Sequence, residues 1–143
     1  MRVQHKSIIV TGAGNGIGEG IAKRLAAEGG KVIVNDINEA GGQRVVAEIM
    51  AAGGTAAFFK ADVTQSADVK ALVDEALRLH GRLDVVVNNA GGSPYVLAAD
   101  ASVKFSTKII ELNLIGALSV STHANAVMQN QDSGGCIINI SSV

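Results

Sequence analysis

Short apolar runs alternate with amphipathic segments along the whole chain, and this alternation constrains the fold more than any other feature of the sequence. The apolar runs predict strands at 7–11, 32–35, 56–60, 83–88 and 136–140, and the amphipathic segments predict helices at 17–28, 38–52, 68–80 and 103–128. Strands that alternate with helices of this length form a parallel sheet with right-handed crossovers. We therefore expect residues 1–143 to form one α/β domain around a three-layer, doubly wound, Rossmann-like parallel sheet of about five strands.

The composition supports a buried sheet. Hydrophobic residues make up 48% of the chain and aromatic residues only 3%, so the core is mainly aliphatic, which is typical of strands buried on both faces. Against 13 Asp plus Glu there are 12 Lys plus Arg, without the basic cluster that nucleic-acid binding requires. No segment reaches the roughly 18 apolar residues of a membrane helix, and the first residues do not resemble an export signal. We expect a cytoplasmic protein that binds neither nucleic acid nor a membrane.

Cysteine and histidine residues do not predict a metal site. The single cysteine, Cys136, cannot form an internal disulfide, which fits a reducing compartment. His5, His80 and His123 stand in unlike contexts, without the spacing of metal ligands. We therefore expect no metal.

A glycine-rich turn follows the first predicted strand. Residues 11–18 read T-G-A-G-N-G-I-G, which matches T-G-x-x-x-G-x-G and differs from both G-x-G-x-x-G and the phosphate loop of nucleoside triphosphatases. Glycines allow a tight turn whose backbone N–H groups approach a pyrophosphate at the positive end of a helix. A turn without any ligand, or one that serves another nucleotide such as a methyl donor, would have a similar pattern. The residues that we expect to contact a cofactor here are Gly12, Asn15, Gly16, Ile17 and Gly18.

An aspartate closes the second predicted strand, roughly 20 residues after the glycines, where a carboxylate can accept hydrogen bonds from the ribose of an adenosine. This residue is Asp36. A simpler role would be that of an acidic residue that stabilises the next helix N-terminus. A carboxylate here repels a 2′-phosphate, and neither Asn15 nor Ile37 supplies a cation to receive one. The sequence therefore favours NAD over NADP.

With these residues in place, the whole chain resembles the short-chain dehydrogenase/reductase family. Asp62-Val63 looks like the family's adenine-edge pair, and Asn88-Asn89-Ala90-Gly91 like its N-N-A-G motif. Asn113 falls at the position of the helix asparagine that holds a water in a proton relay, and residues 135–142 resemble the strand that delivers the catalytic serine, placed at Ser142. The resemblance implies catalytic roles for Asn113 and Ser142, and further cofactor contacts from Ile37, Asp62, Val63, Asn89, Ala90 and Gly91.

Each of these motifs also has a structural interpretation. Asp62 could cap the turn into the next helix, and Asn88 and Asn89 could be turn formers. Asn113 could satisfy a neighbouring carbonyl or kink its helix. Ser142 could be an ordinary strand-end hydroxyl.

The resemblance implies hydride transfer between NAD and a small-molecule alcohol or ketone, with a Tyr and a Lys in a Y-x-x-x-K motif as acid–base groups. These residues belong beyond Ser142, whereas the single tyrosine of the chain, Tyr95, lies in a predicted loop. We therefore expect an amino-terminal cofactor-binding portion that is inactive alone, with the sheet incomplete at its C-terminal edge and the fifth strand uncovered there.

Two other hypotheses stay open: a non-catalytic nucleotide-binding or regulatory module, and a methyltransferase, which residues 88–91 and Ser142 disfavour. For the complete protein, the resemblance implies a homo-oligomer, a dimer or tetramer, through the long helix at 103–128. Its face formed by Leu112, Ile115 and Leu118 fits such an interface, and core packing explains it equally well.

Overall fold

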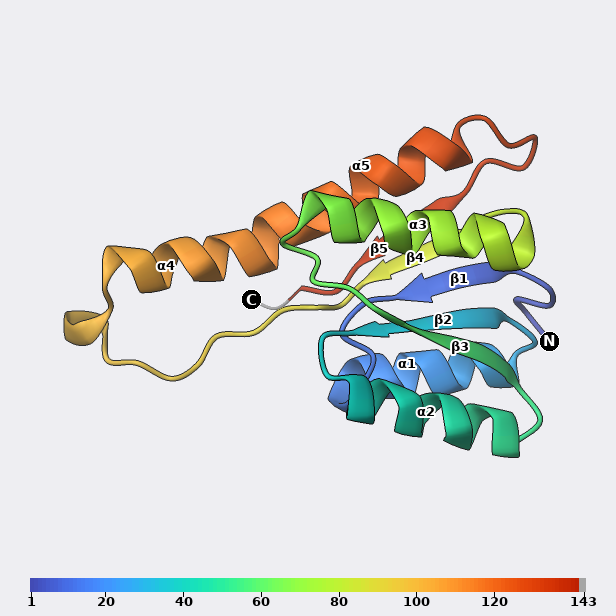
Figure 1. The fold of residues 1–143 in the computed structure, drawn as a ribbon, viewed down its shortest axis with the longest axis horizontal. Helices are drawn as coiled ribbons and strands as arrows, with labels where there is room; N and C mark the ends of the chain where they lie inside the picture. Colours follow the sequence, from blue (N-terminus) through green and yellow to red (C-terminus); the bar gives the residue numbers. More distant parts are fainter. Residues whose placement is uncertain (142–143) are drawn as a thin grey trace.

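The computed structural model describes residues 1–141 and contains one five-stranded parallel sheet flanked by helices (Figure 1). The strands are β1 (Ser7–Val10), β2 (Lys31–Asp36), β3 (Thr55–Lys60), β4 (Val85–Asn88) and β5 (Cys136–Asn139). The helices are α1 (Gly16–Ala27), α2 (Glu39–Ala51), α3 (Ser66–His80), α4 (Val103–Ile110) and α5 (Gly116–Met128), with a short 3₁₀ helix η1 (Ala98–Asp100) and a π-helical segment η2 (Glu111–Ile115). Each predicted strand and helix is present, with bounds within two residues of the prediction.

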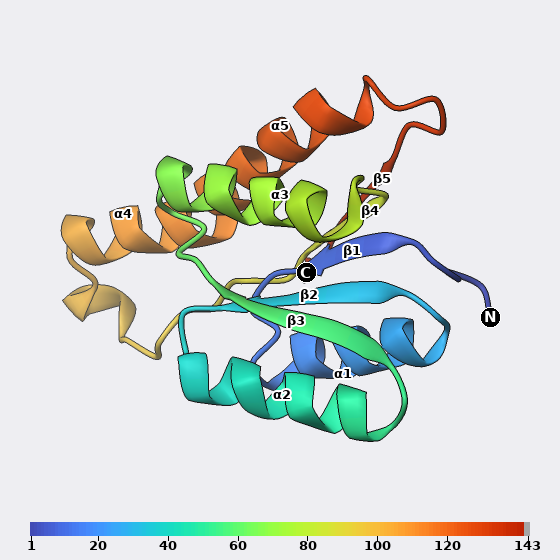
Figure 2. The same cartoon turned by 45° about the vertical axis from the view of Figure 1, so that its right-hand side comes forward.

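The central strands are buried on both faces, which explains their continuous apolar sequences. Side chains of β1 alternate between the two faces, since successive residues of a strand point in opposite directions. Ile8 and Val10 pack in the core beneath α1 and α2, whereas Ile9 packs in the core beneath α3 and α5. Figures 1 and 2 show these two helix pairs on opposite sides of the sheet. The predicted three-layer arrangement is confirmed.

The strand order reverses between β1 and β4. The order across the sheet is β3-β2-β1-β4-β5, and β1 pairs in parallel with both β2 and β4. The segment after β1 leads to α1 on one face, and the segment after β4 leads to the helices of the other face. Doubly wound sheets bind ligands in the crevice that opens where two such segments diverge.

The long helix predicted at 103–128 is continuous, but its middle turn is π-helical rather than α-helical. The π-helical segment η2 contains Asn113, whose Nδ2 donates to the carbonyl oxygen of Ile109 at 2.9 Å. Such local widenings of a helix occur mostly as single turns, frequently at functional sites. The α4 end of this rod projects beyond the sheet, and none of its residues is buried (Figure 1).

Two large apolar side chains of the helices are exposed. Ile17 has 69% of its surface exposed and Met50 has 60%. On α2, Val45 and Ile49 fill the core, and Met50 is turned by about 100° from Ile49, toward solvent. Ile17 lies in the first turn of α1 and lines the cavity at the carboxyl ends of the strands.

Among the described residues, β5 is an outer strand of the sheet, as predicted. Its neighbour is β4, and Ile138 and Ile140 are 43% and 42% exposed. Within residues 1–141, no helix has both the length and the apolar character that crossing a membrane requires.

Candidate functional site

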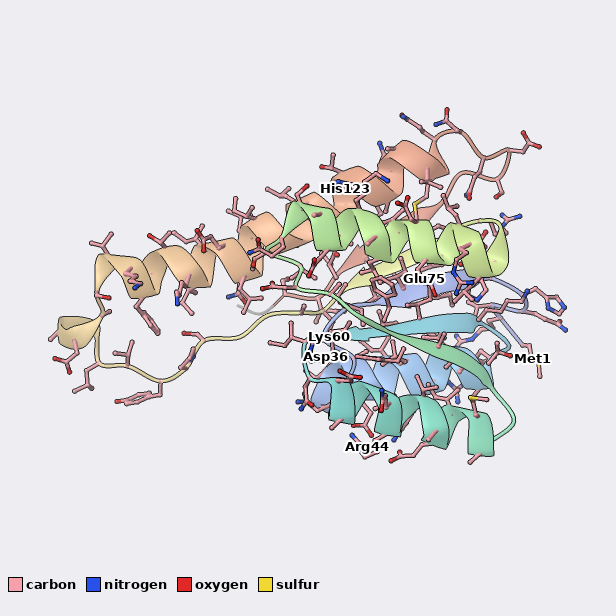
Figure 3. All side chains as sticks on the ribbon, in the orientation of Figure 1. Met1, Asp36, Arg44, Lys60, Glu75 and His123 are labelled. Carbon is pink, nitrogen blue, oxygen red and sulfur yellow. The ribbon has the colours of Figure 1, made fainter. Side chains whose placement is uncertain are left out.

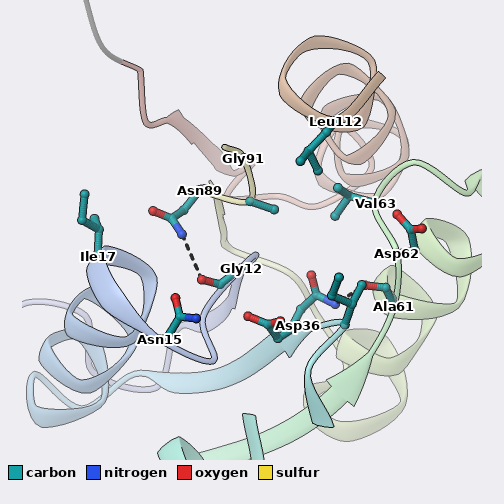
Figure 4. A pocket seen from close by; sticks show the side chains of 13 residues that line it. Gly12, Asn15, Ile17, Asp36, Ala61, Asp62, Val63, Asn89, Gly91 and Leu112 are labelled. Atoms are coloured by element: carbon teal, nitrogen blue, oxygen red, sulfur yellow. Dashed lines mark hydrogen bonds between the residues drawn. The ribbon is translucent and has the colours of Figure 1, made fainter. Parts of the chain in front are cut away.

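A cavity of about 400 Å³ lies at the carboxyl ends of β1, β2 and β4, in the crevice between β1 and β4 (Figure 4). Ten of its lining residues were predicted as cofactor contacts: Gly12, Asn15, Ile17, Asp36, Ile37, Asp62, Val63, Asn89, Ala90 and Gly91. The predicted contacts Gly16 and Gly18 belong to the same turn but do not line the cavity. Asn35, Ala61 and Leu112 line it without having been predicted.

The glycine turn leaves the N-terminus of α1 open. Asn15 stands at the N-cap position, but its side chain makes no capping hydrogen bond. Gly16 has a left-handed backbone with φ of +55°, and a Cβ atom there would meet no heavy atom within 4 Å. Unpaired N–H groups at a helix N-terminus form a favourable site for an anion. The turn therefore fits a phosphate or diphosphate.

Gly18 allows α1 to pack directly against the turn. A Cβ atom at this position would lie 2.2 Å from the carbonyl oxygen of Gly12 and 2.5 Å from Nδ2 of Asn89. No larger residue fits without movement of the backbone. Gly18 therefore sets the position of α1 and does not itself line the cavity.

The carboxylate of Asp36 faces the glycine turn, as predicted (Figure 4). Its Oδ2 accepts a hydrogen bond from the backbone N–H of Gly14 at 2.8 Å, and its Oδ1 accepts one from the N–H of Asn38 at 2.9 Å. Each carboxylate oxygen has two lone pairs, so both retain capacity for a hydroxyl donor. Two backbone N–H groups thus hold the Asp36 carboxylate at the cavity wall, and each of its oxygens can accept a further hydrogen bond.

Thr11 and Asn89 join the two segments that line the crevice. The Nδ2 of Asn89 donates to the carbonyl oxygens of Thr11 at 3.0 Å and of Gly12 at 3.1 Å (Figure 4 shows the second bond). The buried hydroxyl of Thr11 accepts from the N–H groups of Asn89 and Ala90, both at 3.0 Å. The sequence placed Thr11 only at the start of the turn, and its role as a link between β1 and β4 was not predicted.

The wall formed by β2 and β3 has one polar residue that was not predicted. The Nδ2 of Asn35 is buried and donates to the carbonyl oxygens of Phe59 and Ala61 at 3.1 and 3.0 Å. A lone amide at the end of the apolar run of β2 was the available signal. Asp62 lines the cavity and also stabilises its own turn, since its Oδ1 accepts from the N–H and the hydroxyl of Thr64 at 2.9 and 2.8 Å.

Asn113 fastens the loop after β4 to the long helix. Its Oδ1 accepts from the N–H of Gly92 and its Nδ2 donates to the carbonyl oxygen of Gly92, both at 2.8 Å. It lines a second hollow, of about 260 Å³, together with Asn88, Asn139 and Ser141. Ser142, the predicted catalytic serine, lies outside the described residues.

Asn88 is the most buried polar residue of this second hollow. Its Nδ2 donates to the Ser121 hydroxyl at 2.9 Å and to Oδ1 of Asn139 at 2.8 Å. Its Oδ1 is buried and has no hydrogen-bond partner within the part of the chain that the structure describes. Asn88 thus connects β4, β5 and α5 below the loop that carries Asn89.

Comparisons of the sequence and of the fold with known proteins both find short-chain dehydrogenases and oxidoreductases. The short chain dehydrogenase family model matches residues 6–143. An uncharacterized oxidoreductase from Methylorubrum extorquens is 40% identical over an alignment of 143 residues, which covers 99% of this chain and 56% of the relative. A 2,5-dichloro-2,5-cyclohexadiene-1,4-diol dehydrogenase from Sphingobium indicum is 39% identical over an alignment of 142 residues, which covers 96% of this chain and 54% of the relative.

One similar solved structure is a 7α-hydroxysteroid dehydrogenase in complex with NADH and 7-oxoglycochenodeoxycholic acid. It is 36% identical, with a TM-score of 0.89, and the match covers 98% of this chain and 54% of the other. The chain therefore spans about half the length of the relatives it matches.

Proposed function

The chain belongs to the short-chain dehydrogenase family, and on this premise we propose that it is the NAD-binding portion of an oxidoreductase that acts on an alcohol/carbonyl pair. The observation that carries the proposal is the contact between Gly14 and Asp36, 2.8 Å from N–H to Oδ2, at the wall of the cavity. A carboxylate held beside the N-terminus of α1 supports a site where ribose hydroxyls and a diphosphate would bind side by side. A family relative bound to NADH supports the choice of cofactor class.

The residues of the cavity divide naturally among the parts of an adenine dinucleotide. The turn from Gly12 to Gly18 would hold the diphosphate on backbone N–H groups, and Asp36 would hold the adenosine ribose. The wall formed by Ile37, Asp62 and Val63 would hold the adenine. Asn89, Ala90 and Gly91 would line the path toward the nicotinamide. The cavity volume, about 400 Å³, lies within the range of small-molecule sites.

The charges around Asp36 favour NAD over NADP. A 2′-phosphate would meet the Asp36 carboxylate and would need a free cation nearby. The guanidinium of Arg44 is engaged by Glu19 and Glu48, and the ammonium of Lys60 lies 3.8 Å from a carboxylate oxygen of Glu39. Among the described residues, these two cations are thus already paired with carboxylates, which supports a site without a cation to receive the 2′-phosphate.

The bound nicotinamide would accept or donate hydride at a carbon that bears a hydroxyl or carbonyl group. Asn113 holds Gly92, next to the proposed nicotinamide path, and Ser142 would hydrogen-bond the substrate oxygen. Relatives named as dehydrogenases of a cyclic diol and of a hydroxysteroid support a secondary alcohol as the substrate class. We also propose that the complete protein is a homo-oligomer.

Calorimetric titration of the protein as its gene encodes it tests this function. We expect NAD to bind and S-adenosylmethionine not to bind. In a separate absorbance assay, we expect NAD to be reduced in the presence of a secondary alcohol. Binding of S-adenosylmethionine alone would indicate a methyltransferase instead. NAD binding without turnover of any alcohol or ketone would indicate a non-catalytic module.

A further inference from the structure

Arg44, on α2, contacts both ends of the segment that leads into α1. Its Nη2 donates to the carbonyl oxygen of Gly14 at 3.2 Å. The same guanidinium donates to both carboxylate oxygens of Glu19, from Nη2 at 2.6 Å and from Nη1 at 3.0 Å. Residues 15–18 lie between these two attachment points. Figure 3 shows Arg44 on α2, below Asp36 in this view.

Within residues 15–18, Asn15 and Gly16 have few restraints of their own. The Asn15 side chain makes no capping bond, and the surroundings of Gly16 are open. Glycine has more conformational freedom to lose than any other residue, so a glycine-rich segment needs external contacts to keep one shape. Arg44 supplies such contacts from a neighbouring helix. A further restraint on this segment is the hydrogen bond from the N–H of Gly14 to Asp36.

The guanidinium is itself held by a cluster of four charged side chains, defined here as the α1–α2 ion cluster: Glu19, Lys23, Arg44 and Glu48. Arg44 donates to Glu48 at 2.8 Å, and Lys23 bonds to both glutamates. Hydrogen bonds from Arg44 and then Lys23 lower the pKa of Glu19 to about 2. The cluster contains two positive and two negative groups. The net charge of the cluster is therefore near zero, and its electrostatic effect on a diphosphate is small. The members of the cluster differ in their contacts, because Arg44 is the member that bonds to the glycine turn.

We propose that Arg44 is a positioning residue for the cofactor, which acts by holding residues 14–19 in the shape that presents the α1 N-terminus to a diphosphate. The inference rests on the proposed NAD-binding function. The peptide groups of Gly14 are bonded on both sides, with the N–H to Asp36 and the carbonyl oxygen to Arg44. Gly14 is therefore held between Asp36, the proposed ribose acceptor, and Arg44, and this fixes the distance from Asp36 to the proposed diphosphate site.

Two matched substitutions separate geometry from charge. Arg44→Met and Lys23→Met each remove one cation from the α1–α2 ion cluster, but only Arg44 contacts Gly14. In the protein as its gene encodes it, we expect Arg44→Met to raise the NAD dissociation constant about tenfold and Lys23→Met to change it less than about threefold. Arg44→Lys, which keeps the charge but cannot bridge both groups, is expected to give an intermediate value.

A second measurement is independent of the cofactor. Backbone ¹⁵N relaxation of the NAD-free protein reports the order of residues 15–18, and we expect their order parameters to fall from about 0.85 toward 0.6 in Arg44→Met only. Equal weakening of NAD binding by both Met variants, or unchanged order parameters in Arg44→Met, would overturn the positioning role. Wild-type protein that keeps this order pattern yet does not bind NAD would refute the proposed function, and with it the role of Arg44 toward a cofactor.

Discussion

Thr11 and Asn89 are hydrogen-bonded to each other in both directions across the crevice between β1 and β4. The Thr11 hydroxyl accepts from the backbone N–H of Asn89, and the Asn89 side-chain amide donates to the backbone carbonyl of Thr11, both at 3.0 Å. These bonds set the spacing between the glycine turn and the loop after β4. The width of the candidate cofactor site therefore depends on two polar side chains whose partners are all backbone groups.

Replacing Thr11 with Val removes the hydroxyl and keeps the shape of the side chain. Two partly buried N–H groups, of Asn89 and Ala90, then lose their acceptor, and we expect a loss of about 1–3 kcal/mol in the free energy of unfolding. Equilibrium urea unfolding measures the loss. Thr11→Ser retains the hydroxyl and is expected to lie much closer to the wild type. Equal stability of Thr11→Val and wild type would contradict the role of this bond.

Two glycines of α1 are expected to respond to alanine with opposite signs. The Gly18 Cβ position is occupied by the Gly12 carbonyl oxygen at 2.2 Å, so Gly18→Ala is expected to cost about 1–3 kcal/mol and to weaken NAD binding. Gly20 has open space, so Gly20→Ala is expected to stabilise the protein by about 0.5–1 kcal/mol through helix propensity alone. Thermal unfolding of both variants is the measurement, and a shift of the same sign in both would be inconsistent with the packing of α1.

Acid stability depends in part on Glu19. Its pKa falls from 4.5 to about 2 in the folded protein, so the folded state binds this proton less readily than the unfolded state. The resulting stabilisation is present above pH 4.5 and is lost as the pH falls from 4.5 toward 2. In Glu19→Gln, unfolding measured across this range is expected to show a shallower dependence on pH. An unchanged slope would mean that the ion cluster does not persist in solution.

The sequence predicted the elements of the fold because burial leaves a local signal. A strand such as β1, buried on both faces, is continuously apolar, and the glycines and Asp36 follow strands at positions that the topology brings together. Helical periodicity does not show which apolar side chains at the end of a helix lie beyond the core: Ile17, in the first turn of α1, is 69% exposed.

Contacts between distant segments gave little or no signal in the sequence. The π-helical turn at Asn113 accompanies bonds to Gly92, in a loop whose position follows from tertiary structure. The contact between Arg44 and Gly14 joins α2 to the glycine turn through an exposed charged side chain, and one sequence does not indicate which of many surface charges will pair. The roles of Asn35 and Thr11 likewise depend on which strands are neighbours.

The measurement that tests the account most directly is the ratio of the dissociation constants for NADP and NAD, determined by calorimetry for the wild type and for Asp36→Asn. Asparagine keeps the size of the side chain and an acceptor for the Gly14 N–H, but removes the negative charge. We predict that the wild type binds NAD at least about tenfold more tightly than NADP, and that Asp36→Asn loses most of this preference. Equal affinities in the wild type, or a ratio that Asp36→Asn leaves unchanged, would contradict the assignment of Asp36 to the adenosine ribose.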